Sequence, residues 1–341
     1  MRVVAIIINY RTPELVIRCL SALAEERAAV PDLRAVVADN NSKDGSAERL
    51  SVELSNGAFA DWVEFVALPV NGGFGWGNNQ AILHYLRGQS LPDAIYLLNP
   101  DTSVEPGALS ALVRDLEGKA DAGAVGSQLL NVDGSFAGSA FRFPSIGREF
   151  TRGLGIGRVE RLLGIEPTLV PFGVRQPVDW VTGASVLIRT AAIADTGLFD
   201  TGFFLYFEEV ELMYRLKKHG WQTYHCPESR VIHIAGASTG VVNGKTDGDR
   251  PPPDYFFQSR ERFFILTGGK LRSLVADLAW LLGAAMASIV RVFLLGHHWA
   301  PSISERGALF RIGLEAREGD TLPAISHFGD RVGELPAWMQ E

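Results

Sequence analysis

The chain has 341 residues, of which 47% are hydrophobic and 21% charged, so it can bury one large core or two smaller ones and is not a disordered protein. Its formal net charge is −7 and it has no long basic run, which argues against a nucleic-acid duplex as a partner. The only two cysteines, Cys19 and Cys226, lack metal-type Cys/His spacing, so we expect reduced thiols, as in a cytosolic protein.

Strand and helix patterns alternate over the first 130 residues at the spacing of βαβ units. Thr12-Pro13 predicts a helix start, with an N-cap followed by proline at the first helical position. Because crossovers between parallel strands are right-handed, this half should form an α/β fold with a mostly parallel, Rossmann-like sheet flanked by helices. Apolar, β-branched runs predict its buried strands at 3–8, 34–38, 63–68 and 94–98.

Two of these strands end in acid, at Asp39 and in the Asn99-Pro100-Asp101 element. Since chemistry in open α/β sheets collects outside the carboxyl ends of the strands, the two acids indicate one shared cleft. Asp101 is also well placed to hold a hard cation. Each acid has a structural alternative, because Pro-Asp is a common turn and an Asp after a strand often caps the next helix.

A glycine-rich segment, 71–79, precedes a helix that should run through about Leu86. It lacks the dinucleotide fingerprint, which belongs directly after the first strand. From about residue 123 we expect added strands with a hairpin at 131–134. Residues 142–178 are rich in Gly, Pro and Arg and are predicted to be an irregular, mobile or acceptor-facing excursion, and 236–253 is predicted to be a flexible loop.

Three acids stand at a predicted helix start, within Phe203–Glu211. Helical spacing places Glu209 on the apolar stripe of Leu212, Met213 and Leu216, and places Glu208 and Glu211 on a solvated face, where Glu211 can pair with Arg215. Burial would raise the pKa of the Glu209 carboxyl and suit it to general-base catalysis. The alternative is that Glu209 only caps the helix.

The segment from Leu278 to Val290 carries no charge and is bounded by Asp277 and Arg291. Thirteen residues are too few to span a bilayer, which needs about 20. Two interpretations stay open, a buried helix or an amphipathic segment over 271–299 that rests on a membrane. The residues that favour the second are Lys270, Arg272, Arg291, His297 and Trp299.

Five segments in this order resemble the inverting family 2 glycosyltransferases of the GT-A fold, especially rhamnosyltransferase-like members. The resemblance runs from about residue 3 to 237. It implies a GT-A domain over 1–237, with a nucleotide-binding half (1–122) and an acceptor-binding half (123–237). A flexible loop and a helical extension would follow over 238–341. The five segments are 8–11, 37–46, 71–75, 98–101 and 206–211.

The resemblance also implies a site. Asp101 matches the last acid of the family's D-x-D metal motif, and Asn99 stands where the first Asp often stands. His233, which could otherwise be a structural histidine at a strand end, matches a later metal-shell His; the cation would be Mg²⁺ or Mn²⁺. Glu209 matches the catalytic base, usually Asp. The nucleotide pocket would use Tyr10, Arg11, Asp39, Asn71 and Gly73, and the acceptor site Trp180, Gly183 and Ala184.

The implied reaction is a single displacement that transfers a sugar from a nucleotide diphosphate to a hydroxyl of a cell-surface glycan or lipid-linked acceptor. dTDP-rhamnose is the favoured donor, although UDP-linked sugars, including galactofuranose, fit the same motifs. The enzyme would be cytoplasmic or peripheral at the inner face of the membrane. A sugar-phosphate nucleotidyltransferase should instead have a basic Gly-rich loop at 9–13, and a non-catalytic binding relative should lack Glu209 or Asp101.

Overall fold

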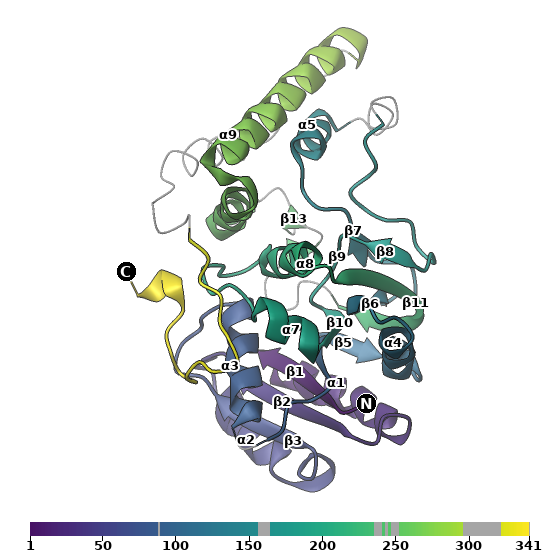
Figure 1. Ribbon diagram of the computed structural model, residues 1–341, viewed down its shortest axis with the longest axis vertical. Helices are drawn as coiled ribbons and strands as arrows, with labels where there is room; N and C mark the ends of the chain where they lie inside the picture. Colours follow the sequence, from purple (N-terminus) through teal and green to yellow (C-terminus); the bar gives the residue numbers. More distant parts are fainter. Residues whose placement is uncertain are drawn as a thin grey trace.

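A nine-stranded mixed sheet runs through the molecule (Figure 1). The computed structural model describes residues 1–87, 89–155, 164–234, 241–242, 245–246, 252–295 and 322–340. The first four strands pair in parallel, in the order β3-β2-β1-β4, as the alternating pattern predicts. Their bounds are β1 (Val3–Asn9), β2 (Leu33–Asp39), β3 (Val63–Ala67) and β4 (Ala94–Leu98).

The other half of the sheet is mixed, with the order β10-β6-β11-β5 continuing from β4. β10 is antiparallel to both of its neighbours, whereas β6 and β11 are parallel to each other. The bounds are β5 (Thr102–Val104), β6 (Ala122–Leu130), β8 (Gln176–Val178), β10 (Ser185–Arg189) and β11 (Gln222–His233). Two small ribbons pair β7 (Ala140–Phe141) with β9 (Trp180–Val181), and β12 (Val241–Val242) with β13 (Lys245–Thr246).

Helices cover both faces of the sheet (Figure 1). They are α1 (Pro13–Glu25), α2 (Ser46–Leu54), α3 (Phe74–Leu86), α4 (Ala108–Glu117), α5 (Ile146–Leu154), α7 (Thr190–Thr196) and α8 (Glu208–Lys218), with short 3₁₀ turns η1 (Glu26–Ala28), η2 (Gly57–Phe59) and η4 (Ala337–Met339). Within its described residues, 142–155 and 164–178, the predicted irregular excursion contains helix α5 and strand β8. Most of the predicted loop over 236–253 lies outside the described residues.

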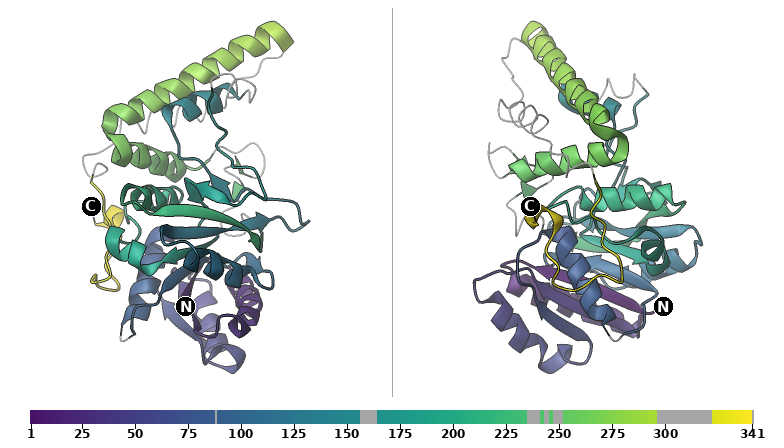
Figure 2. Two further views of the ribbon diagram at one scale, coloured as in Figure 1. Left: turned by 45° about the vertical axis from the view of Figure 1, so that its right-hand side comes forward. Right: turned by 60° about the vertical axis from the view of Figure 1, so that its left-hand side comes forward.

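A long helix, α9 (Asp254–Leu295), kinks at Gly268–Gly269, where Gly269 has φ +77°. The first arm lies over α8, and the second rises from the body of the protein alongside α5 (Figure 2). Within the described residues, Asp254–Ile289 is long and apolar enough, by length and composition, to cross a membrane. The charge-free run is thus part of a longer helix than the sequence pattern indicates; His297 and Trp299 lie outside the described residues.

The second arm of α9, which contains the charge-free run, has one buried face and one exposed apolar face. One face is buried through Ala276, Trp280, Ala284 and Ala287. The opposite face is an exposed apolar stripe, defined by Leu271, Leu274, Leu278, Leu282, Met286 and Ile289. The arm is therefore neither a core helix nor an isolated surface helix.

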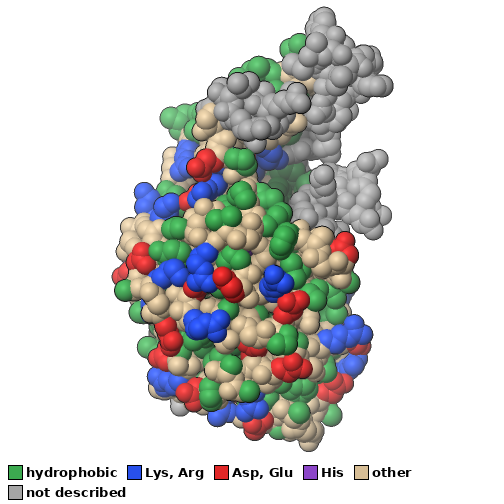
Figure 3. Space-filling view, turned by 90° about the vertical axis from the view of Figure 1, so that its right-hand side faces the viewer, with side chains coloured by type: hydrophobic (Ala, Val, Ile, Leu, Met, Phe, Trp, Pro, Cys, Tyr) green, Lys and Arg blue, Asp and Glu red, His purple; other side chains and the backbone are tan. Residues whose placement is uncertain are grey.

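Acidic and basic side chains are interspersed on the face shown in Figure 3. No broad basic patch stands out among the described residues of that face.

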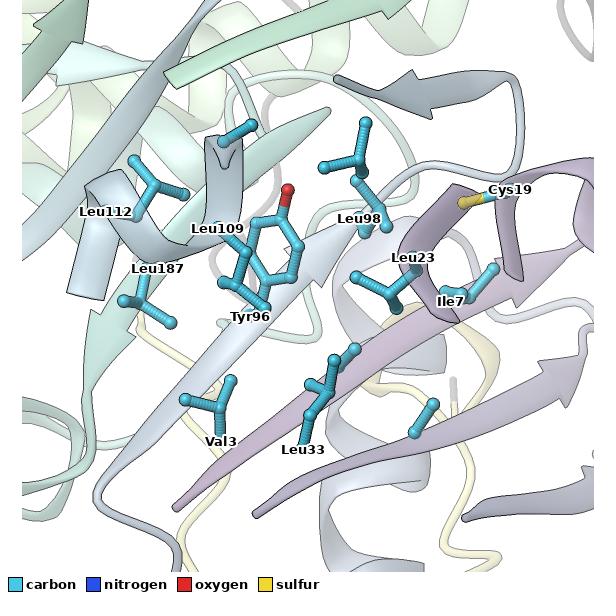
Figure 4. Close-up of a cluster of buried hydrophobic side chains, with 14 of the residues drawn as sticks. Val3, Ile7, Cys19, Leu23, Leu33, Tyr96, Leu98, Leu109, Leu112 and Leu187 are labelled. Atoms are coloured by element: carbon cyan, nitrogen blue, oxygen red, sulfur yellow. The ribbon is translucent and has the colours of Figure 1, made fainter. Parts of the chain in front are cut away.

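Alternate residues of β1 pack into two hydrophobic cores, one on each face of the sheet. Val3, Ala5 and Ile7 face the α1 and α4 side of the sheet, and Val4, Ile6 and Ile8 face the side covered by α3 and α8. Figure 4 shows the first core, with the Tyr96 ring among leucines of β4, β10 and α4. The cysteines Cys19 and Cys226 are buried free thiols, as expected. This packing fixes the strand ends that carry the site.

Candidate active site

The Asn-Pro-Asp element connects β4 directly to β5, at the edge of the sheet where β11 also ends. Thr102 pairs with His233 across β5 and β11, and this register brings His233 Nε2 to 3.3 Å from Asp101 Oδ1. The Ile234 N–H also donates to the Asp101 carbonyl (2.9 Å). Residues 132 positions apart are thus brought together, and Asp101 is only 7% exposed.

Asn99 completes this group with an amide oxygen. Its backbone N–H donates to the Ala184 carbonyl (3.0 Å), while its buried Oδ1 has no hydrogen-bond partner. A buried oxygen without a partner, two residues before the Asp101 carboxylate that pairs with His233, fits a divalent cation that accepts oxygen and nitrogen ligands. In the described part of the chain no three His, Cys, Asp or Glu side chains cluster as a metal site, so any cation here would need the Asn99 amide or substrate oxygens.

Asp39 lies at the end of β2, and its carboxylate organises the loop that follows. Oδ2 accepts from Asn9 Nδ2 (2.7 Å) and from the Ser42 hydroxyl (2.6 Å), and Oδ1 accepts from the Ser42 N–H (2.9 Å). Ser42 also receives the Arg11 backbone N–H (2.9 Å), and the Arg11 guanidinium lies 5.0 Å from the Tyr10 ring centroid. The structure therefore gathers Tyr10, Arg11 and Asp39 around Ser42, which the sequence did not single out.

A pocket of about 450 Å³ opens beside this loop. It is lined by the end of β2, by the loop and by the start of α2. Two lining residues, Asn41 and Lys43, have φ of +58° and +56°, as does Arg11 nearby with +61°. Non-glycine residues rarely adopt this left-handed conformation, and such backbone strain concentrates at functional loops.

The glycine-rich loop before α3 is tied both to this pocket and to the segment before α8. Asn71 Oδ1 accepts from Asn40 Nδ2 (3.0 Å) and from the Gly73 N–H (3.1 Å). Gly73 has φ +87°, and a Cβ there would overlap the Phe204 carbonyl oxygen, which accepts the Phe74 N–H (3.0 Å). Glycine is thus required at residue 73 by a backbone-to-backbone approach. The residue that approaches it, Phe204, belongs to the aromatic run that leads into the predicted helix start.

Glu209 lies at the start of α8, and its Oε2 atom is buried without a hydrogen-bond partner. Burial raises the pKa of the Glu209 carboxyl to about 7, while backbone N–H groups of Glu209 itself, Gly183 and Val210 oppose this rise. A carboxyl that exchanges its proton near neutral pH suits general-base catalysis. The inward orientation predicted for Glu209 thus applies to its carboxyl end.

The prediction that Glu208 and Glu211 lie on a solvated face is wrong. Glu208 is 2% exposed, and burial, then the charge of Glu209, raises the pKa of its carboxyl well above the usual range. Glu211 forms the predicted ion pair with Arg215 (2.8 Å), but the pair is buried, and Arg215 also donates to the carbonyls of Thr196 and Leu198. The cause is tertiary, since α8 packs against α7 and α3 and lies under α9.

The residues expected at the acceptor side lie on the β9–β10 connection. The Gly183 N–H donates to the Glu209 carboxyl, and the Gly183 α-carbon lies against the Phe74 ring. The carbonyl of the buried Ala184 accepts the Asn99 backbone N–H. These two residues connect the Glu209 carboxyl to the Asn99 turn. Trp180 is half-buried on the β7–β9 ribbon, where its ring stacks on Phe141 (centroids 4.3 Å apart).

Comparison with known proteins identifies the family. A family model described as "Glycosyl transferase family 2" matches residues 4–158. The N-acetylglucosaminyl-diphospho-decaprenol L-rhamnosyltransferase of Mycobacterium tuberculosis is 30% identical over 241 residues, which cover 64% of this chain and 71% of the relative. The chain belongs to glycosyltransferase family 2. The rhamnosyltransferase WbbL of Escherichia coli is also similar, with 28% identity over 169 residues, 48% of this chain and 61% of that protein.

Solved structures with the same fold are glycosyltransferases of low sequence identity. The mannosyltransferase PcManGT of Pyrobaculum calidifontis, in complex with GDP-Man and Mn²⁺, has a TM-score of 0.50 and 14% identity, over 92% of this chain and 79% of that chain. Residues 1–349 of S. aureus TarS give 0.52 and 12%, over 94% and 80%. The predicted GT-A fold and the predicted rhamnosyltransferase-like family are confirmed, and the protein is a glycosyltransferase. This decides against the nucleotidyltransferase and non-catalytic alternatives.

Proposed function

We propose that this family 2 enzyme transfers rhamnose, with inversion, from dTDP-rhamnose to a hydroxyl of a lipid-linked glycan. The observation that supports it is the short connection from Glu209 through Gly183 and Ala184 to the Asn99 turn. The Glu209 carboxyl, whose Oε2 is buried, is thus linked to the turn that carries the residues suited to a cation, and a displacement between acceptor and nucleotide diphosphate needs both groups.

In the proposed mechanism Glu209 takes the proton from the acceptor hydroxyl while that oxygen attacks the anomeric carbon. The bond from this carbon to the diphosphate oxygen breaks in the same step, so the configuration inverts once. Asp101, Asn99 and His233 would hold Mg²⁺ or Mn²⁺, which supplies positive charge for the departing diphosphate when bound. Tyr10, Arg11 and Asp39 would receive the nucleotide, and Asn71 and Gly73 the diphosphate or donor sugar.

The donor and acceptor follow from the relatives. Both curated relatives described above are rhamnosyltransferases, and the name of the mycobacterial enzyme specifies a decaprenyl-diphosphate acceptor bearing N-acetylglucosamine. Trp180, with Gly183 and Ala184, would border such an acceptor. UDP-linked sugars are the competing donors, since TarS has been crystallised with UDP-GlcNAc.

The test is a panel of dTDP-, UDP- and GDP-sugars offered to the purified enzyme with polyprenyl-diphosphate N-acetylglucosamine, with and without Mn²⁺ or Mg²⁺. We expect metal-dependent transfer from dTDP-rhamnose and a product of inverted anomeric configuration. Preferential transfer from a UDP- or GDP-sugar would overturn the donor, and a retained configuration would overturn the mechanism.

We also propose that the exposed stripe of α9 rests on the inner face of the membrane, within the predicted contact region 271–299. Leu278 is 55% exposed within the stripe, and Lys270 and Arg272 lie at its start, where they can meet anionic lipid headgroups. Such contact would bring a lipid-linked acceptor to the enzyme. The full chain should float with anionic vesicles, and Leu274→Ser/Leu278→Ser/Leu282→Ser should not. Val52→Ser, at an exposed apolar residue of α2, is the matched control.

A further inference from the structure

The turn before α8 has a strained backbone. Tyr206 and Phe207 have φ of +69° and +68°, in the left-handed region that is unfavourable for aromatic residues. Such a conformation persists only where surrounding contacts hold it. Because Glu208 and Glu209 follow at once, the same turn sets the direction in which the Glu209 carboxyl points.

The first arm of α9 supports this turn from one side. The Tyr206 ring packs on Tyr255 (centroids 6.0 Å apart) and on Phe256 (5.5 Å), and the Ser259 hydroxyl donates to the Leu205 carbonyl (2.9 Å). These contacts come from residues beyond 237, the end of the region that resembles the family.

The C-terminal segment 322–340 supports the turn from a second side (Figure 2). It pairs with the strand-like residues that lead into the turn, where the Leu198 N–H donates to Ser326 (2.7 Å) and the Thr201 N–H donates to Ala324 (2.9 Å). Further along, the segment is fixed to α3 by a hydrogen bond from Trp76 Nε1 to the Glu334 carbonyl (2.8 Å). It thus bridges α3 and the approach to Glu209.

Trp338, near the end of this segment, contacts Phe204 edge to face, with centroids 5.3 Å apart and an interplanar angle of 87°. Phe204 is also the residue whose carbonyl receives the Phe74 N–H and lies against Gly73. One side chain of the C-terminal segment therefore reaches the turn that carries the base and the loop expected at the donor.

We propose that segment 322–340 is a positioning element of the active site, and that Trp338 is the residue through which it holds the turn before Glu209. The proposal rests on the proposed role of Glu209 for its effect on catalysis. Trp338 is a positioning residue here, since it touches neither substrate nor cation in the proposed arrangement.

A purely structural role for Trp338 makes different predictions. Trp338 is 38% exposed, so its truncation leaves no closed cavity in the core and the protein should fold. A structural role would lower the melting temperature and leave the turn and the pH dependence of catalysis unchanged. Leu335, exposed to a similar degree in the same segment, provides a matched control, because it has no ring to make the edge-to-face contact that joins Trp338 to Phe204.

The first measurement is hydrogen exchange on the full chain without substrate, followed in peptides that cover 203–211. Trp338→Ala should speed exchange there by about threefold or more, whereas Leu335→Ala and Trp338→Phe should match wild type. Equal exchange in Trp338→Ala and wild type, or the same acceleration in Leu335→Ala, would overturn the proposal.

The second measurement is transfer to the polyprenyl-diphosphate acceptor. Trp338→Ala should lower kcat by about three- to tenfold. It should also move the acid limb of the pH profile to lower pH, because water would reach Glu209 and lower the pKa of its carboxyl. Trp338→Phe should restore both kcat and the acid limb. An unchanged kcat and limb would overturn the positioning role. The two hypotheses fail separately: an active Glu209→Gln enzyme would refute Glu209 as the base, whereas the exchange result depends on no substrate.

Discussion

Replacing Glu209 by glutamine is the most direct test of the proposed base. Glutamine keeps the size and hydrogen bonds of the side chain but cannot take a proton from the acceptor. Because a positioned general base contributes about 100- to 10,000-fold, kcat should fall by about 100-fold or more while the Kd of dTDP-rhamnose stays unchanged. Steady-state transfer and titration calorimetry measure the two quantities separately.

The pH dependence of kcat in the wild-type enzyme tests the raised pKa of Glu209. With the pKa of Glu209 raised to about 7, kcat should rise about tenfold for each pH unit below 7 and level off above it. Glu208→Gln is the matched control, because burial also raises the pKa of the neighbouring Glu208 carboxyl but this carboxyl has no role in the proposed mechanism. Turnover by Glu209→Gln near the wild-type rate, or an acid limb near pH 4–5, would refute the reasoning.

Glu209→Gln should stabilise the folded protein at alkaline pH, although it lowers the rate of transfer. The pKa of the Glu209 carboxyl is higher in the folded protein (about 7) than in the unfolded chain (4.5), so its contribution is fully present below pH 4.5 and is lost as pH rises through 7. At pH 8 the buried charge costs roughly 3 kcal/mol. Glu209→Gln should therefore melt at a higher temperature than wild type at pH 8, and the difference should disappear below pH 4.5.

Three further substitutions test other parts of the site. Asp101→Asn should raise the Mn²⁺ concentration for half-maximal transfer by about tenfold or more, in a titration after chelation; an unchanged requirement would remove Asp101 as a ligand. Gly73→Ala should reduce transfer by about ten- to 100-fold because its Cβ meets the Phe204 carbonyl, whereas Gly134→Ala, with φ +80° and open space, should cost only about 1 kcal/mol of stability. Arg215→Met should lower the free energy of unfolding in urea by about 3–5 kcal/mol, because it leaves Glu211 buried and unpaired. Glu211→Met/Arg215→Met should recover part of this stability, and equal losses in the single and double variants would contradict the explanation.

The parallel half of the fold was predictable because β1, β2 and β4 are buried on both faces, whereas the edge strand β3 is partly exposed. Such strands appear in the sequence as continuous apolar runs, and the predicted limits of β1, β2, β3 and β4 agree with the structure to within about a residue or two. The start of α1 at Pro13 was equally clear, since proline at the first helical position needs no tertiary information.

Helix α5 was not predictable, because its support comes from a segment more than 100 residues away. Gly153 lies against the Trp280 carbonyl and Gly283 against the Phe150 carbonyl, so both helices approach closely. Glu149 pairs with Arg260 across the same interface (2.9 Å). The Gly- and Arg-rich composition of this segment therefore predicted an irregular structure, because the sequence does not show that α9 packs against it.

The candidate site residues could be proposed from the sequence, but their geometry could not. The order of the motifs indicated Asp101, His233 and Glu209, but the β5–β11 register was needed to bring His233 to Asp101. The helical pattern also placed Glu208 outside, because a single helix cannot show that α3 packs against it at Gly75. Long-range packing decides the pKa of both carboxyls at the start of α8.

The predicted domain boundary at residue 237 can be tested through the contacts that cross it. Asp200 is fully buried and accepts from Arg262 at 2.8 and 2.9 Å, and Phe203 packs with Phe263 and Phe264. A chain ending at 237 keeps every proposed site residue but exposes these groups beside the turn that carries Glu209. We expect it to retain the helix and sheet signal in circular dichroism and to lose transfer; full activity of this fragment would show that the extension is not needed to hold the base.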